Sequence, residues 1–199
     1  KTLQNILKSN FQSKIYSIDE FIQRYETAIE HFEYDNDTNH YFKGIISHLT
    51  DKCGGNVYSN NVVKLSYSSI YGAHAKNEYI FDLENENTYF QFDHSIDKPS
   101  NRSWLIFDFG PHIKIRPNKY SIRSRNCIKG ENHMKSWKIE GSNTCDENDW
   151  KILDKKVNEE CLDNPKAKHL FDIENLQPNE YFRYLRFYQT GPDSENEFY

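Results

Sequence analysis

The side chains in this sequence that could act as bases, nucleophiles or metal ligands are eight histidines, four cysteines and 30 carboxylates. Such numbers produce chance pairs in any fold, so only their spacing can indicate joint chemistry. The sequence contains no GxSxG, HExxH, phosphate-binding-loop or GxGxxG motif, and no cysteine sits in a known nucleophile signature. We therefore expect a protein that is not an enzyme and that binds no cofactor.

The spacing also argues against a metal site. Asp93 and Asp97 share one loop, but no dense set of oxygen ligands of the kind that calcium needs surrounds them. Neither a CxxC pair nor a cysteine–histidine zinc pattern occurs among the four cysteines, which are Cys53, Cys127, Cys145 and Cys161. We expect no bound metal, and thiols in a reducing compartment rather than disulfides.

Charge and hydropathy limit the possible partners. Lys and Arg (25) are scattered and outnumbered by Asp and Glu (30), so we expect no nucleic acid held through its phosphates. No apolar run approaches the roughly 18 residues of a membrane span, and no signal-peptide core opens the sequence. Because residue 1 is a lysine, we expect the chain to be a fragment of a longer protein.

The elements that must position any functional side chain change in character near residue 55. Residues 17–20 (SIDE) form a capping box, and apolar residues recur at helical spacing over 18–32. A second apolar stripe over 42–49 stops at Gly54–Gly55, where a helix can end. The pattern predicts short N-terminal helices.

From residue 56 onward, short alternating runs with turn signals between them predict strands. Aromatic residues make up 15% of the chain, which favours strands, and no helix is long enough to connect parallel strands. We therefore expect a mainly β fold, an antiparallel β-sandwich or barrel. The nine predicted strands cover residues 62–69, 79–83, 88–92, 103–110, 119–125, 136–141, 150–153, 169–173 and 181–190.

Two of the three tryptophans bracket one polar run. Residues 136–140 alternate polar and apolar side chains, which predicts a strand that buries Trp137 and exposes Glu140. The polar residues 141–149 predict a loop, and Trp150 opens the next strand. We expect both tryptophans to be core anchors.

Four segments together resemble the discoidin-like family, also called the coagulation factor V/VIII C-type domain. They are SWLIFDFG (103–110), KYSIRSR (119–125), SWKIEGSN with a tryptophan further on (136–150) and FRYLRFYQTGP (182–192). The resemblance implies an antiparallel jelly-roll sandwich of the galactose-binding-like type. It also implies a closing strand after QTGP, so we expect the sandwich to be cut before its last strand.

The versions YSIRSRN, HMKSWKIEGSN and FRYLRFYQTGP resemble the intracellular branch of that family, found in protist proteins and in BTB-containing adaptors. The stretch GIISHLTDKCGGNVYSNNVV (44–63) resembles the lead-in of those proteins. This resemblance implies a helical linker, or the remnant of an upstream helical domain, over 1–55, a discoidin-like sandwich over 56–199, and a cytoplasmic location.

In the resembled family the ligand meets loops at one end of the sandwich, which correspond here to residues 70–78, 91–101 and 126–135. A protein partner within an adaptor is the expected ligand, and a carbohydrate is the alternative. The loops lack the exposed Trp, Leu or Phe side chains of membrane-binding relatives, so membrane binding is not expected. The candidate ligand-binding residues are Tyr71, His74, Asp93, His94, Arg125 and His133.

Overall fold

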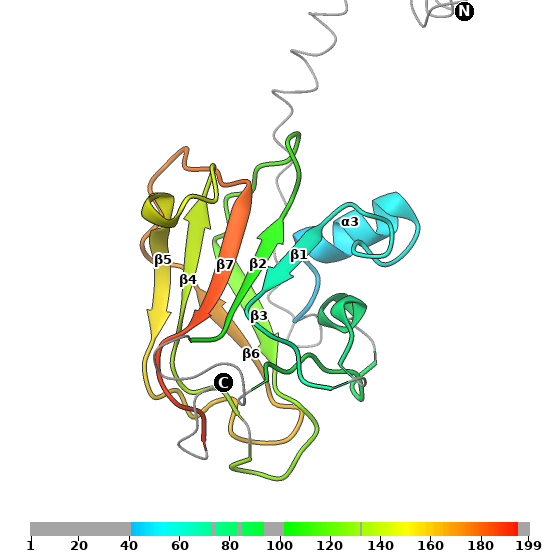
Figure 1. The fold of residues 1–199 in the computed structure, drawn as a ribbon, viewed down its shortest axis with the longest axis vertical. Helices are drawn as coiled ribbons and strands as arrows, with labels where there is room; N and C mark the ends of the chain where they lie inside the picture. The colour runs from blue at the N-terminus through cyan, green and yellow to red at the C-terminus, as the bar shows by residue number, and fades with distance from the viewer. Residues whose placement is uncertain (1–40, 73–74, 83–84, 94–101, 132, 195–199) are drawn as a thin grey trace, which may run out of the picture. The chain divides into compact units, whose positions relative to one another are not determined.

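Two antiparallel sheets form the framework of the protein, and Figure 1 shows the smaller sheet behind the larger one. The larger sheet has the strand order β1–β2–β7–β4–β5, and the smaller one pairs β3 with β6. In chain order the strands are β1 (Lys64–Tyr67), β2 (Trp104–Asp108), β3 (Lys119–Arg123), β4 (Trp137–Ser142), β5 (Lys151–Lys156), β6 (Lys168–Asp172) and β7 (Tyr184–Gln189).

The computed structural model describes residues 41–72, 75–82, 85–93, 102–131 and 133–194. They all belong to one compact unit that runs from Glu33 to Tyr199. The helix predicted over 18–32 lies outside the described residues. Within those residues, no helix has the length and apolar character needed to cross a membrane.

The main core lies between the two sheets. Trp137 of β4 is fully buried, and its ring meets Phe171 of β6 edge-on at 5.2 Å between centroids. Its indole Nε1–H donates to the Tyr120 hydroxyl (2.9 Å), which in turn donates to the Asp154 carboxylate (2.6 Å). The predicted role of Trp137 as a core anchor is confirmed, because its one polar atom has a partner inside the core.

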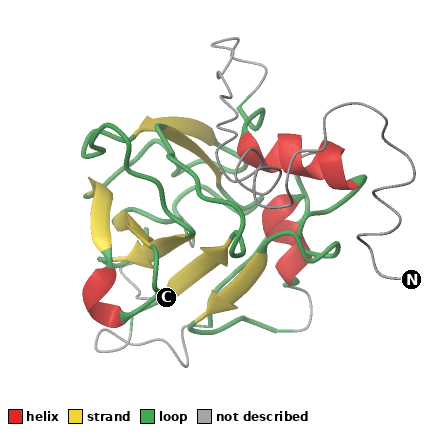
Figure 2. Ribbon diagram, turned by 90° about the horizontal axis from the view of Figure 1, so that it is seen from above, coloured by secondary structure: helices red, strands yellow, loops and turns green. Residues whose placement is uncertain are grey.

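A second core cluster lies under the helix α3 (Ile45–Cys53), which Figures 1 and 2 show on the β1 side of the sandwich beside the 3-10 helix η1 (Asn77–Phe81). Leu49 is the buried residue of α3, and it packs in the same cluster as Phe81. Gly54 ends the helix in a left-handed conformation (φ 71°), which a residue with a side chain rarely adopts. The helix end predicted at Gly54–Gly55 is confirmed.

Seven of the nine predicted strands form, and two predictions are wrong. Residues 79–81 lie in η1, where the Tyr79 and Asp82 amides bond three residues back, and no described strand pairs with residues 79–82. Such a short apolar run does not distinguish a strand from a helical turn. Residues 88–92 form no ladder either. Isolated hydrogen bonds hold this segment instead, including one from the Tyr71 backbone N–H to the Gln91 carbonyl (2.9 Å).

Three predictions about the stretch 136–150 are also wrong. Glu140 is only 2% exposed, because its carboxylate bonds the Arg186 guanidinium across the neighbouring strand β7 (2.7 Å). Gly141 does not end the strand, which runs to Ser142. Trp150 lies outside the core: it is half-buried, and the Arg186 guanidinium stacks on its ring at 4.2 Å.

All four cysteines lie in described residues, and none of them forms a disulfide. The expectation of thiols in a reducing compartment remains a prediction.

Candidate functional site

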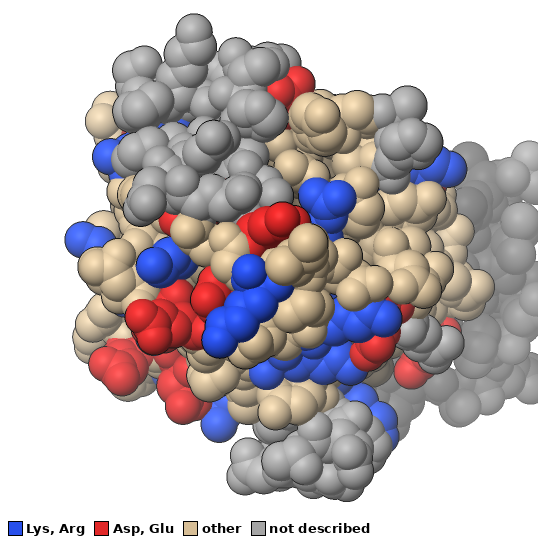
Figure 3. All heavy atoms as spheres, turned by 90° about the horizontal axis from the view of Figure 1, so that it is seen from below, with Lys and Arg blue, Asp and Glu red and all other residues tan. Residues whose placement is uncertain are grey.

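A pocket of about 110 Å³ lies at one end of the sandwich, where β3 and β7 end and β4 begins. The chain reaches it from five separate stretches of the sequence. Figure 3 views the molecule from this end and shows basic and acidic side chains side by side, so neither charge dominates the visible face. The residues that line the pocket are Phe90, Gln91, Phe92, Arg123, Ser124, Arg125, His133, Met134, Leu162, Gln189 and Asp193.

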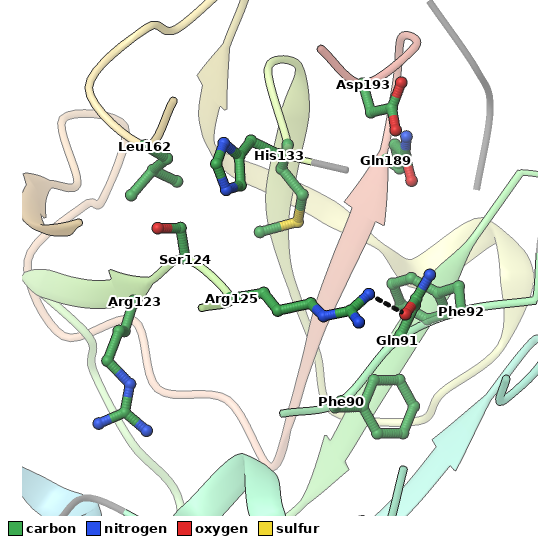
Figure 4. A pocket seen from close by; sticks show the side chains of 11 residues that line it. Phe90, Gln91, Phe92, Arg123, Ser124, Arg125, His133, Leu162, Gln189 and Asp193 are labelled. Carbon is green, nitrogen blue, oxygen red and sulfur yellow. Dashed lines mark hydrogen bonds between the residues drawn. The ribbon is translucent and has the colours of Figure 1, made fainter. Parts of the chain in front are cut away.

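Arg125 lies in the middle of the pocket, as Figure 4 shows. One of its terminal N–H groups donates to the Gln91 side-chain oxygen (2.8 Å), and its guanidinium stacks on the Tyr89 ring at 4.3 Å. These two contacts hold the side chain in place. Its buried Nε has no hydrogen-bond partner in the described part of the chain, so Arg125 presents a fixed cationic donor to the pocket.

Gln189 supplies a buried acceptor. It is 2% exposed, and its Nε2 donates to the Gly191 carbonyl (3.0 Å), which fixes the orientation of the amide. The Oε1 atom is buried and has no hydrogen-bond partner among the described residues. A buried acceptor without a partner destabilises a protein by about 1–3 kcal/mol. A ligand that donates a hydrogen bond would therefore recover that energy at this atom.

Two phenylalanines form part of the apolar wall. Phe90 and Phe92 meet edge-to-face at 5.3 Å, and Phe90 also meets Tyr67 of β1 edge-on at 5.5 Å. Rings held by other rings present a rigid apolar surface beside the polar groups of Arg125 and Gln189. A few convergent polar groups against an apolar wall are the usual composition of a small-ligand site.

His133 forms a buried side of the pocket. It is 1% exposed; its Nε2 lies 3.1 Å from the Cys127 thiol, and its Nδ1 lies 3.7 Å from an Asp163 carboxylate oxygen. Its backbone N–H donates to the Ser194 hydroxyl (3.0 Å), which ties the loop before β4 to the segment after β7.

The structure brings two of the six predicted site residues, Arg125 and His133, into the pocket. Tyr71 and Asp93 lie in neighbouring loops that are joined by backbone contacts but do not line the pocket. His74 and His94 lie outside the described residues, so their predicted role remains a prediction.

Gln91 and Gln189 line the pocket, but neither is among the six predicted site residues. Gln189 carried a readable signal, because β7 alternates and Leu185, Phe187 and Gln189 fall on its inward face. A glutamine at an inward position needs a buried partner or a ligand. Gln91 had no such signal, since it was read as part of a strand that does not form.

No protein-family model matches the chain, and no curated protein matches it in sequence. Solved structures do match in fold. The module CBM32-3 from a family 31 glycoside hydrolase of Clostridium perfringens superposes with a TM-score of 0.52 at 16% identity, covering 69% of this chain and 85% of that one.

Two further matches are weaker. The module CpGH89CBM32-5 from Clostridium perfringens, in complex with GalNAc-β-1,3-galactose, has a TM-score of 0.47 at 13% identity and covers 65% of this chain and 84% of that one. Chitosan-binding module 1 from a chitosanase/glucanase of Paenibacillus has a TM-score of 0.45 at 15% identity, covering 65% and 83%.

The match to CBM32-3 concerns the fold, and it agrees with the strand order and the two-layer packing described above. The chain has a mainly β, antiparallel two-sheet sandwich fold like that of CBM32-3. The predicted fold class is thus confirmed. Membership of the intracellular, adaptor-associated branch remains a prediction.

Proposed function

We propose that this chain is a noncatalytic recognition module that binds a carbohydrate in the pocket around Arg125 and Gln189. The observation that carries the proposal is the buried Gln189 Oε1, an acceptor without a hydrogen-bond partner among the described residues. Gln189 lines a pocket that also holds a fixed guanidinium. A sugar hydroxyl donates one hydrogen bond and accepts others, so the hydroxyl groups of a sugar can pair both with an acceptor such as Gln189 and with a donor such as Arg125.

The walls of the pocket support the same ligand class. A sugar ring has an apolar face of C–H groups, and Phe90 and Phe92 offer an apolar surface next to the polar groups. The cavity of about 110 Å³ suits a small group rather than a folded chain. The named carbohydrate-binding structures suggest which sugars to test first, galactose and N-acetylgalactosamine.

Titration calorimetry of the folded protein with these two sugars, followed by a wider glycan panel, tests the proposal. Gln189→Leu keeps the approximate size of the side chain and removes the acceptor, so we expect it to weaken binding at least about tenfold, or ~1.4 kcal/mol. Arg125→Lys removes the planar guanidinium and should weaken binding to a similar extent.

The matched control is Arg116→Lys, the same change on an exposed residue before β3, at the opposite end of that strand from Arg125. It should leave the affinity unchanged. The proposal is wrong if no sugar in the panel binds the wild-type protein up to millimolar concentration, or if all three variants bind equally well.

A protein partner is the second candidate, and exposed apolar side chains at the same end favour it. Tyr71 is 46% exposed and Ile128 is 69% exposed, and both lie on the loops predicted to carry recognition. Such side chains are frequent anchors in protein interfaces. In this case the chain would act as the partner-binding module of a cytoplasmic adaptor.

The two candidates can be separated with one double variant. Tyr71→Ala with Ile128→Ser should abolish binding to a purified protein partner and leave sugar titrations unchanged. If the double variant instead lost sugar binding and kept the partner, the two surfaces would be assigned the wrong way round.

A further inference from the structure

At the rim of the sandwich, a thiol lies next to an imidazole, and the imidazole lies next to a carboxylate. The Cys127 Sγ is 3.1 Å from His133 Nε2, and His133 Nδ1 is 3.7 Å from Asp163 Oδ1. Cys127 and His133 belong to the connection between β3 and β4, whereas Asp163 belongs to the connection between β5 and β6. The proposed carbohydrate site uses neither Cys127 nor Asp163.

His133 is the buried centre of this group. Its side chain is 1% exposed, and within the described residues neither its Nδ1 nor the Asp163 Oδ1 has a hydrogen-bond partner. The nearby carboxylate therefore favours the proton on Nδ1 and leaves the Nε2 lone pair facing the thiol. A base oriented in this way by a third group is the arrangement that activates a nucleophilic side chain.

The thiol has a competing acceptor. The Cys127 Sγ is also 3.0 Å from the Glu131 carbonyl, to which an S–H can donate. If the hydrogen points there, the thiol stays protonated; if it passes to His133, a thiolate–imidazolium pair forms and Asp163 stabilises the imidazolium. The reactivity of Cys127 therefore depends on which acceptor takes the hydrogen.

The other charged groups around Cys127 are of both signs. The β3–β4 connection carries Arg125, Lys129, Glu131 and Lys135. The β5–β6 connection, which backbone bonds tie to it, carries Glu159, Glu160, Asp163 and Lys166. The four cations and four anions of the two connections sum to no net charge, so the 3.1 Å contact with His133 is the feature on which the proposal rests.

We propose that Cys127 is a modification site whose thiolate reacts with small electrophiles, with hydrogen peroxide as the oxidant. His133 Nε2 takes the thiol proton, and the thiolate attacks one peroxide oxygen. The O–O bond breaks, and the leaving hydroxide takes the proton from His133 and departs as water. The sulfur, oxidised by two electrons, becomes a sulfenic acid, and the peroxide is reduced to water.

Two other cysteines serve as internal controls. Burial raises the pKa of Cys145 and of Cys161, so both stay as thiols at neutral pH. In the described structure neither thiol has a histidine contact like that of Cys127. A single sample therefore compares a thiol that contacts an imidazole with two that do not.

The experiment is site-resolved alkylation of the folded 199-residue protein with iodoacetamide between pH 5 and 9, quantified by mass spectrometry of each cysteine peptide. At pH 6.5 we expect Cys127 to react at least about tenfold faster than Cys145 and Cys161. After peroxide treatment, a 1,3-dione probe for sulfenic acid should label Cys127 in preference to those two.

Three variants separate activation from mere exposure. His133→Asn should lower the Cys127 rate about tenfold, and Asp163→Asn should lower it less; the second variant keeps the test usable if the first does not fold. Glu160→Gln, the same kind of change on an exposed residue of the same connection, should leave the rate unchanged. The proposal is overturned if Cys127 reacts no faster than the control cysteines, if Asp163→Asn leaves its rate unchanged, or if the dione labels no Cys127.

Discussion

At the scale of single residues, Asp149 shows how the polar loop between β4 and β5 is held. One of its carboxylate oxygens accepts four hydrogen bonds: from the Ser142 hydroxyl (2.6 Å), the Asn143 amide (3.0 Å), and the Thr144 hydroxyl (2.9 Å) and amide (3.1 Å). These bonds, with that from Ser142 first, lower the pKa of Asp149 from 3.8 to about 2. The run of turn-forming residues is therefore an organised loop around one carboxylate.

The first prediction concerns the pH dependence of stability. Because the folded pKa of Asp149 is below its ordinary value, its stabilising contribution is complete above about pH 4 and is lost as the pH falls toward 2. Asp149→Asn should therefore lower the Tm above pH 4, and its deficit relative to wild type should shrink between pH 4 and 2. Thermal melts across this range measure it. The control is Asp146→Asn in the same loop; an equal deficit in both variants at all pH values would contradict the prediction.

The two tryptophans allow a second prediction at this scale. Trp137 is fully buried between the sheets, so Trp137→Ala should lower the free energy of unfolding by about 3–5 kcal/mol. Trp150 is half-buried and stacked on Arg186, so Trp150→Ala should cost only about 1–2 kcal/mol, in the range of a partly desolvated cation–π contact. Urea unfolding of both variants measures the difference. Equal losses would mean that the sheet face around Arg186 is packed as tightly as the core.

At the scale of elements, side chains of β4 and β7 contact each other on both faces of the sheet. Toward the core, Trp137 stacks on Phe187 at 6.2 Å; on the opposite face, the Glu140–Arg186 pair is nearly buried under Trp150. Burying an ion pair is favourable only when both charges keep their hydrogen-bond partners. The ring of Trp150 therefore has a positioning role over the guanidinium rather than a place in the core.

Gly141 gives the third prediction, because it lies where β4 meets the Phe182 ring. A Cβ at this position would come within 2.6 Å of that ring, closer than packed atoms allow. We expect Gly141→Ala to destabilise the protein by about 1–3 kcal/mol. Adding Phe182→Leu should recover part of the loss, as a double-mutant cycle would show. Additive losses would indicate that the strand moves away from the ring instead.

At the scale of the described unit, two core clusters meet at one residue. The cluster between the sheets and the cluster under α3 share the partly buried Leu185 of β7, whose side chain packs against both. The pocket lies at the end of the same strand, at Gln189. Packing in both clusters thus fixes the strand that carries the buried acceptor.

The fourth prediction follows from this shared position. Leu185→Ala should destabilise the protein by about 2 kcal/mol, and hydrogen exchange should become faster both in α3 and in β4. Val157→Ala, a truncation at a residue that is 59% exposed, is the control and should leave exchange in both regions unchanged. Faster exchange in only one region would show that the two clusters open independently.

Local patterns in the sequence were sufficient for most of the fold. Alternation predicted seven strands that form, a glycine pair predicted the end of α3, and the motifs around Trp104, Trp137 and Arg183 indicated the galactose-binding-like sandwich. These features depend on residues that are close together in the chain, or on the spacing between motifs, and both can be seen in a single sequence. The predictions failed at residues 79–83 and 88–92, where short aromatic runs fit more than one conformation.

The site was decided by the tertiary structure. Gln91, Arg125 and Gln189 are separated by 34 and 64 positions in the sequence, and only the pairing of β2 with β7 and the crossing of β3 behind them bring the three together. The burial of Glu140 and the half-buried position of Trp150 outside the core also depend on Arg186, which lies on another strand. The alternation of polar and apolar residues predicts which face of a strand each side chain occupies. What covers that face is determined by partners that are distant in sequence, and so it could not be read from the residues alone.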